Sequence, residues 1–261
     1  MSGAPAAVPG PWRIEHACQA AWPTAAETLI DGWLLRAGGG ATRRLNSLNP
    51  IEHGPRDPAP VLAQARAMLA ACRKPLTVRV PAIAVGLDTA LDALGFGAPE
   101  DATLTLLAAP AAAAPDASVT MTSIATPRWL AARAVLAGLD RDGQDQLAAA
   151  VALLVTAAFA TVTDGGIPVA AGYAALVDGV AVLEAIVTGA AHRRRGHARR
   201  LVAALQGWAA AQGAEAVCLQ VAAANTPAHA LYRGVGFTTE LYRYHYRVVG
   251  ADGLEPPTSS V

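Results

Sequence analysis

The sequence carries little charge. Asp, Glu, Lys and Arg make up 15% of its 261 residues, whereas 53% are hydrophobic. A chain this apolar can bury a large core, which excludes disorder and predicts one large domain or two small ones. The formal net charge is zero, so no global attraction favours nucleic acid or an anionic membrane as a partner.

Patterns typical of metal sites are missing as well. Cys18, Cys72 and Cys218 lie far apart in the sequence, and the six histidines form no His-x-x-x-His pair. We therefore expect no metal site. So sparse a set of cysteines is typical of buried thiols in a reducing compartment rather than of catalytic ones.

Targeting and membrane-spanning patterns are also absent. The N-terminus has no basic segment followed by an apolar run, so we expect no signal peptide. The uncharged stretch Leu147–Thr163 is short for a membrane span and continues into a strand pattern, so we interpret it as a buried helix followed by a strand. The sequence predicts a soluble, cytoplasmic protein.

The second half of the chain alternates between helix and strand patterns. It follows the alanine- and proline-rich tract Ala108–Ser118, which we interpret as a linker. Asp178-Gly179 between two apolar runs predicts a hairpin turn. The predicted elements are strand Val119–Ile124, helices Pro127–Leu139 and Gln144–Val155, strands Ala157–Val162, Ile167–Val177 and Val180–Val187, a helix ending near Ala211, strand Ala216–Val221, helix Pro227–Val235, and one or two strands within Phe237–Val248. This order predicts an α/β fold (an α+β mixed sheet).

The first half shows a parallel order. Its predicted elements are paired strands Trp33–Arg36 and Arg43–Leu48, helix Pro58–Ala71, strand Leu76–Val80, helix Leu87–Leu94 and strand Ala102–Leu107. The last helix ends at Gly95-Phe96, as the last helix of the second half ends at Gly236-Phe237. We infer an internal duplication from this parallel.

Six residues, Arg193 to Ala198, stand between an apolar strand and a long helix in the pattern Arg-x-x-Gly-x-Ala. A glycine lets the backbone approach a ligand closely, and the first helical turn leaves N–H groups unpaired at the positive end of the helix dipole. Such a segment binds phosphate, and the arginines add attraction. The alternatives are a solvated helix end and a nucleic-acid patch. The short run, the neutral chain and the missing aromatic platform disfavour the patch.

A second motif, Asn225 to Phe237, follows after one helix and one strand. Together the two segments resemble the GNAT superfamily of acyl-CoA N-acyltransferases, whose patterns are Gln/Arg-x-x-Gly-x-Gly/Ala and Asn-x-x-Ala-x-x-Leu-Tyr-x-x-x-Gly-Phe. The resemblance covers about residues 118–249. It implies a GNAT-like fold with a catalytic, acyl-CoA-binding domain at 118–249, a linker at 109–117, and a degenerate GNAT-like domain at 11–108.

The resemblance also implies roles for individual residues. A loop and helix start that hold the coenzyme A pyrophosphate, chiefly through backbone N–H groups, consist of Arg193, Arg194, Arg195, Gly196, His197, Ala198 and Arg199. The strand segment that pairs with pantetheine consists of Ile186, Val187 and Thr188. A backbone N–H of Val187 or Thr188 would polarise the thioester carbonyl. Asn225 would contact the cofactor arm.

Two residues are the catalytic candidates. Tyr232 occupies the place of the general acid that protonates the departing thiolate, and a hydroxyl within hydrogen-bond reach can do this. The alternative is a tyrosine that only packs on its helix, with its hydroxyl at the surface. Glu184, in an otherwise apolar strand, is the candidate base. Desolvation in a cleft would raise its pKa, while orienting the amine or being solvated are its alternatives.

The implied reaction is N-acetylation by direct attack of a primary amine on acetyl-CoA, or another short acyl-CoA, in a ternary complex. Acetyl-CoA is then a co-substrate, no metal takes part, and the acceptor is a small-molecule or protein amine. Neither nucleic acid nor a membrane is an expected partner, and a homodimer is left open. The alternative function is a non-catalytic acyl-CoA sensor or interaction module on a GNAT scaffold.

The first half lacks these features. The Gly-Phe register places Leu91 opposite Tyr232 and Ala84 opposite Asn225, and no Arg-x-x-Gly-x-Ala follows the segment Asn46–Pro50. We therefore expect one active site. Residues 31–47 resemble the front of certain tandem GNAT proteins. A polar cluster there either lines an acceptor pocket or an interdomain face, or belongs to a polar hairpin; its members are Arg43, Arg44, Asn46, Ser47 and Asn49.

Overall fold

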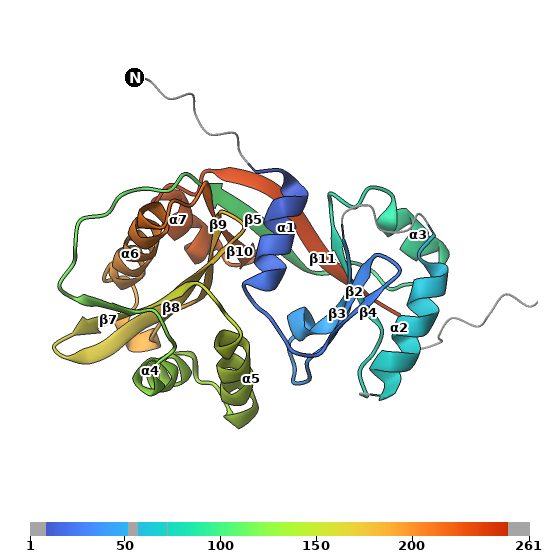
Figure 1. Cartoon of the computed structure of the whole chain (residues 1–261), viewed down its shortest axis with the longest axis horizontal. Helices are drawn as coiled ribbons and strands as arrows, with labels where there is room; N and C mark the ends of the chain where they lie inside the picture. Colours follow the sequence, from blue (N-terminus) through green and yellow to red (C-terminus); the bar gives the residue numbers. More distant parts are fainter. Residues whose placement is uncertain (1–8, 52–56, 72, 250–261) are drawn as a thin grey trace, which may run out of the picture. The chain divides into compact units, whose positions relative to one another are not determined.

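The computed structural model describes residues 9–51, 57–71 and 73–249 (Figure 1). The chain forms two compact units, each made of two stretches. Unit 1 combines the residues up to Pro23 with Leu104–Leu241, and unit 2 combines Thr24–Thr103 with the residues from Tyr242 onward. The division into 11–108, 109–117 and 118–249 stays a prediction about domains.

Unit 1 is built on a large mixed sheet with the strand order β5-β10-β9-β8-β7-β6. Strands β6 to β9 pair antiparallel and β9 pairs parallel with β10. Helices α4 and α5 cover one face, while α6 and α7 lie on the other (Figure 1). Its elements are α1 (Pro11–Ala20), β5 (Glu100–Ala108), β6 (Val119–Thr122), α4 (Pro127–Ala137), α5 (Arg141–Ala152), β7 (Ala157–Asp164), β8 (Ile167–Val177), β9 (Val180–Thr188), η2 (Ala190–His192), α6 (His197–Ala211), β10 (Ala216–Ala222), α7 (Thr226–Arg233) and the start of β11 (Thr239–Val248).

Local sequence explains where these elements begin and end. Thr126 caps α4 by accepting a hydrogen bond from the Trp129 N–H at 3.1 Å, and Asp140 caps α5 in the same way. The β8–β9 hairpin turns at Asp178 (φ 46°) and Gly179 (φ 77°), as the Asp-Gly pair predicts. The helices and strands predicted for the second half are all present, with small shifts at their ends.

Unit 2 has the strand order β1-β2-β3-β4-β11. The first three strands pair antiparallel, β3 pairs parallel with β4, and β4 pairs antiparallel with β11. Its elements are β1 (Glu27–Ile30), β2 (Trp33–Ala37), η1 (Arg43–Leu45), β3 (Asn46–Pro50), α2 (Ala59–Ala71), β4 (Thr77–Pro81) and α3 (Leu87–Ala93), together with most of β11.

Two details of the first half differ from the prediction. The predicted strand Arg43–Leu48 begins as a 3₁₀ turn, and only from Asn46 does it become β3. The reason is the Asn46 side chain, which donates to the carbonyls of Gly39 and Thr42 at 2.7 and 2.9 Å and so keeps the preceding residues in a loop. Helix α1 and strand β1 were not predicted, although Pro11 at the first helical position is a start signal.

The closing strands are exchanged between the two units. β5 follows the Gly95-Phe96 pair of unit 2, yet its residues from Leu104 lie beside β10 in unit 1. β11 follows the Gly236-Phe237 pair of unit 1, yet Tyr244–Val248 pair with β4 in unit 2. Each unit therefore closes its sheet with the strand that follows the other unit's last helix.

Candidate functional site

A bulge interrupts β9 after the candidate base. Tyr173 of β8 faces Glu184, while Ala171, two residues earlier, faces Val187, so β9 carries one extra residue. Ala185 absorbs it with φ 55°, a left-handed conformation that is rare for alanine. Beyond the bulge the predicted pantetheine segment stays paired with β8 in a shifted register, through Val187–Ala171 and Thr188–Ala170.

On its other side, β9 loses its pairing with β10 after Leu183. The parallel ladder with β10 runs only from Val180–Ala216 to Leu183–Leu219. On the β8 side the Gly189 N–H donates to the Val169 carbonyl at 3.0 Å. Bonded positions alternate in an antiparallel ladder, so the Thr188 N–H points away from β8. The splay between β9 and β10 therefore leaves this N–H open.

The phosphate-binding motif forms a loop that leads into α6. Gly196 is the N-cap of the helix with φ 81°, and Arg194 also has a positive φ of 65°. A Cβ on Gly196 would meet nothing within 4 Å, so the backbone conformation, not crowding, requires glycine there. The first intrahelical bond is Arg200 N–H to the Gly196 carbonyl at 3.2 Å, which leaves the preceding N–H groups unpaired by the helix.

The side chains of this loop differ in exposure. Arg193, Arg194, Arg195 and Arg199 are exposed, Ala198 is half-buried, and His197 is buried at 4% exposure. The His197 ring makes no hydrogen bond within the described part of the chain, and its Nε2 lies 3.9 Å from Asp164 Oδ2. His197 can thus offer a ligand only its backbone N–H. The exposed arginines leave the helix start accessible to an anion.

Asn225 is the N-cap of α7. Its Oδ1 accepts a hydrogen bond from the Ala228 N–H at 3.3 Å, so this residue has a local structural role. The residue is exposed, and its Nδ2 has no hydrogen-bond partner among residues 9–51, 57–71 and 73–249. The amide therefore keeps one donor group for a ligand.

The two catalytic candidates lie within electrostatic reach of each other. Tyr232 is 8% exposed, and its ring packs edge-on against Phe237 with centroids 5.9 Å apart. Burial, and secondarily the charge of Glu184, raise the pKa of Tyr232 to about 12. Glu184 itself is buried at 7% exposure. Both side chains are thus largely buried, and their catalytic roles stay predictions.

A pair of thiols lies close to this site. Cys18 of α1 and Cys218 of β10 are buried, with their Sγ atoms 3.6 Å apart. The hydrogen bond with Cys18 and burial raise the pKa of Cys218 well above its ordinary value, and the Glu184 charge adds to this. Such a thiol stays protonated and is a poor nucleophile. Cys72 lies outside the described residues.

The polar cluster of the first half forms hydrogen bonds and ion pairs within unit 2. Asn46 binds loop carbonyls, and Asn49 donates to the Leu34 and Ser47 carbonyls at 3.1 and 2.9 Å. Arg43 forms ion pairs with Glu100 and, at 3.1 Å, with Asp101. These contacts match the polar-hairpin alternative.

Sequence reasoning missed two residues that shape the bulge. Arg133 of α4 donates from Nε to the Ala185 carbonyl at 2.6 Å. Gly172 lies opposite the bulge, where a Cβ would come within 3.2 Å of the Ile186 Cα. A glycine inside an apolar strand pattern is a signal for a bulge and could have indicated the second residue. No sequence signal indicated Arg133.

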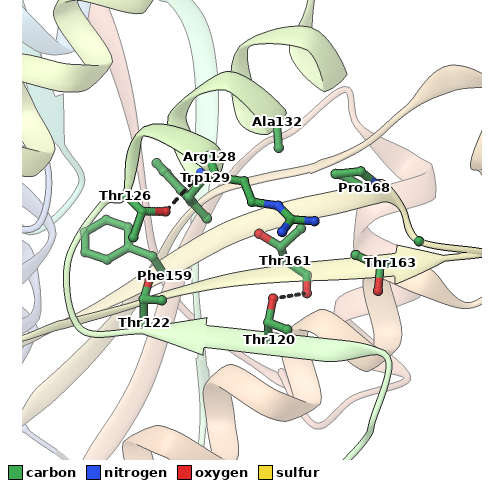
Figure 2. Close-up of a pocket in the computed structure, with 11 residues that line it drawn as sticks. Thr120, Thr122, Thr126, Arg128, Trp129, Ala132, Phe159, Thr161, Thr163 and Pro168 are labelled. Carbon is green, nitrogen blue, oxygen red and sulfur yellow. Dashed lines mark hydrogen bonds between the residues drawn. The ribbon is translucent and has the colours of Figure 1, made fainter.

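A cavity of about 500 Å³ lies elsewhere on unit 1 (Figure 2). Its lining comes from β6, β7, the start of β8 and the first half of α4, and consists of Thr120, Thr122, Thr126, Arg128, Trp129, Ala132, Phe159, Thr161, Thr163, Gly166 and Pro168. None of the predicted site residues is among them. The cavity is therefore separate from the candidate site.

Two further features are absent from the described ranges. No group of three or more His, Cys, Asp or Glu side chains there could hold a metal ion. None of the helices formed by those residues combines the length and the apolar character that crossing a membrane requires.

The fold is that of a class, the GNAT N-acetyltransferases. A GCN5-related N-acetyltransferase from Kribbella flavida superposes with a TM-score of 0.67 over 92% of this chain and 95% of that one, at 19% identity. A tandem GNAT protein from the clavulanic acid biosynthesis pathway gives 0.64 over 91% and 88%, at 15% identity. Within this class, residues 12–247 match the family described as "Probable histone acetyltransferase Rv0428c C-terminal", and the chain belongs to that family.

Curated relatives match over shorter stretches. The probable histone acetyltransferase Rv0428c of Mycobacterium tuberculosis is 54% identical over 39 residues, which are 15% of this chain and 13% of that protein. The uncharacterized N-acetyltransferase YobR of Bacillus subtilis is 35% identical over 79 residues, 30% of this chain and 32% of that protein. The chain thus matches less than a third of the length of either relative.

Proposed function

We propose that the chain is an N-acetyltransferase that transfers an acetyl group from acetyl-CoA to a primary amine by direct attack in a ternary complex. The observation that carries the proposal is the coupling of a buried carboxylate, Glu184, with a buried phenol, Tyr232, whose pKa it helps to raise. Glu184 directly follows Leu183, the last β9 residue in the β9–β10 ladder. The carboxylate can accept a proton and the phenol can donate one.

The residues present fit coenzyme A. The left-handed Gly196 opens α6 with unpaired N–H groups, open space surrounds it, and exposed arginines flank it, as pyrophosphate binding requires. Arg193 to Arg199 would hold the pyrophosphate mainly through backbone N–H groups. The strand segment Ile186–Thr188 would pair with pantetheine in the splay, and Asn225 Nδ2 would donate to the same arm.

Acetyl-CoA, when bound, supplies a thioester carbonyl open to attack by an amine. The Thr188 N–H, which faces away from β8, would donate to that carbonyl oxygen as negative charge develops on it. Glu184 would accept a proton from the acceptor ammonium, directly or through a water. Tyr232, whose phenol is neutral at physiological pH, would donate a proton to the sulfur.

Direct attack is preferred to a covalent intermediate because of the thiols. Cys218 is fully buried and its pKa is raised, so it offers no thiolate. The acceptor would be a small-molecule amine or a protein amine, and the family's description adds histones to the candidates.

The test is an acetyl-CoA consumption assay against small amines, amino acids, and peptides with a free N-terminus or a lysine, histone-tail peptides included. We expect thiol release with at least one acceptor, and a fall of about 10²- to 10⁴-fold for Glu184→Gln with acetyl-CoA binding retained. Tight acetyl-CoA binding without turnover on any acceptor would instead indicate the sensor. Failure to bind acetyl-CoA would refute both readings.

A further inference from the structure

Arg133 makes an unusual contact with the bulge. Its Nε donates to the carbonyl of Ala185 at 2.6 Å, and Ala185 is the left-handed residue directly after the candidate base. The hydrogen bond joins α4 to β9 across 52 positions of sequence. It fixes the direction of one peptide plane inside the segment that would contact the acetyl group.

Helix α4 is anchored firmly enough to hold Arg133 in place. Trp129, one turn earlier on the same helix face, donates from Nε1 to the Ala160 carbonyl at 3.1 Å. Its ring packs edge-on against Phe159 and Tyr173, with centroids 4.9 and 6.2 Å away. Since Tyr173 is the β8 partner of Glu184, this anchor lies beside the bulge.

Gly172 supports the bulge from β8. A Cβ there would lie 3.2 Å from the Ile186 Cα and 3.4 Å from the Glu184 carbonyl oxygen. A side chain at position 172 would therefore force the bulged strand to shift by a few tenths of an ångström. Arg133 and Gly172 thus hold the same three-residue segment, Glu184–Ile186, from two elements.

The contact is costly for the fold. Burial lowers the pKa of Arg133, because desolvation opposes its charge. Its Nη1 is buried and has no hydrogen-bond partner within the described ranges. An unpaired buried N–H of a cation destabilises the folded state, so stability alone does not account for an arginine at this position. Such a local conflict is expected where function sets the residue.

We infer that Arg133 is a positioning residue: it holds Ala185 in the left-handed conformation that orients the Glu184 carboxylate and the Thr188 N–H relative to each other. The inference rests on the proposed function and deepens it. Arg133 touches neither reacting group, and its effect passes through the Ala185 carbonyl.

The test compares Arg133→Met and Arg133→Lys with Arg128→Met, a matched control on the same helix. Arg128 is exposed and makes no hydrogen bond or ion pair with the described residues. We expect Arg133→Met to lower kcat by about 10- to 100-fold, since a displacement of about 1 Å has effects of this size. The KM and Kd for acetyl-CoA should stay unchanged, and the thermal midpoint should not fall, because the substitution removes a buried N–H that has no partner within the described ranges. Lysine should restore part of kcat, because its ammonium can donate to the same carbonyl.

A second readout does not depend on turnover. The amide chemical shifts of residues 184–188 should change in Arg133→Met, while those of the loop Arg193–Arg199 should not. Wild-type turnover in Arg133→Met, or wild-type shifts at 184–188, would overturn the inference. A kcat that falls in parallel with the thermal midpoint and acetyl-CoA affinity would also overturn it, since that pattern indicates a merely structural role. Absence of turnover in the wild type would count against the proposed function, and the shifts would still decide the role of Arg133.

Discussion

Unit 1 and unit 2 end their last helix in the same way but place different residues there. In unit 2, Gly95 has φ 74° and the Phe96 N–H donates to the Leu91 carbonyl at 3.0 Å. In unit 1, Gly236 has φ 101° and the Phe237 N–H donates to the Tyr232 carbonyl at 3.0 Å. This is a common way to end a helix. The shared geometry is therefore structural, and the phenol at one of the two equivalent positions is what differs.

The strands preceding these helices differ more. In unit 2, β2 and β3 pair without a register shift, from Trp33–Pro50 to Ala37–Asn46. In unit 1, the β8–β9 ladder is shifted at the bulge, and β9 then separates from β10. A regular ladder uses up its backbone N–H groups, whereas a bulged and splayed strand keeps some for a ligand. For the proposed function, this places the N–H groups available to a ligand in the irregular backbone of unit 1.

Removing one tyrosine hydroxyl from each unit, in separate variants, should give the largest difference in kcat. Tyr232→Phe should lower kcat by about 10²-fold through loss of the proton donor, while acetyl-CoA binding persists. The matched control is Tyr246→Phe, which removes the hydroxyl of a buried tyrosine in unit 2. Steady-state kinetics and acetyl-CoA titration of both variants check this. Equal turnover in Tyr232→Phe and wild type would remove the phenol from the mechanism.

Sequence predicted those parts of the comparison that depend on neighbouring residues. The Asp178-Gly179 hairpin and the two Gly-Phe helix ends are local, because backbone freedom and short-range hydrogen bonds decide them. The motif at Arg193–Ala198 likewise predicts its own loop and helix. Each of these features can be recognised in a few adjacent letters.

The remaining features depend on contacts between distant segments. A left-handed Ala185 has no local signature, because it is held by Arg133, 52 positions away, and by the missing Cβ of Gly172. The closeness of Cys18 and Cys218 follows from where α1 packs. The exchange of β5 and β11 has the same origin, since an apolar closing strand fits either sheet by its pattern, and only tertiary packing selects one.

A second way to test the comparison uses alkaline unfolding. In the folded chain Tyr232 keeps its proton up to a pKa of about 12, whereas in the unfolded chain it ionises near its ordinary pKa of about 10. The stabilisation is therefore complete below about pH 10 and is lost as the pH rises towards about 12, by on the order of 2 kcal/mol. Burial also raises the pKa of Tyr246, so the ionisation of this tyrosine adds a second loss of stability, in unit 2.

Tyr232→Phe should remove only that part of the alkaline loss of stability that comes from the ionisation of Tyr232 in unit 1. Urea unfolding at about pH 9 and about pH 11 should show a smaller loss of unfolding free energy in this variant than in the wild type. Tyr246→Phe, measured in parallel, reports the share of unit 2. A wild-type loss that persists in full in Tyr232→Phe would mean that the phenol is not desolvated in the folded chain.

The smallest expected effect separates the binding role of a left-handed glycine from its structural role. Gly196 of unit 1 and Gly95 of unit 2 have φ 81° and 74°, and at neither would a Cβ meet an atom within 4 Å. Alanine at either position should lower the unfolding free energy by about 1 kcal/mol, since only the backbone conformation is strained. Only Gly196→Ala should also weaken acetyl-CoA binding, by on the order of tenfold, because a shifted loop loses about one charge-assisted hydrogen bond to the pyrophosphate. Thermal unfolding and acetyl-CoA titration of the two variants measure both quantities. If Gly95→Ala weakened binding as much as Gly196→Ala, the loop at α6 would have no special part in holding the coenzyme, and the contrast between the two units would depend on Tyr232 and the bulge alone.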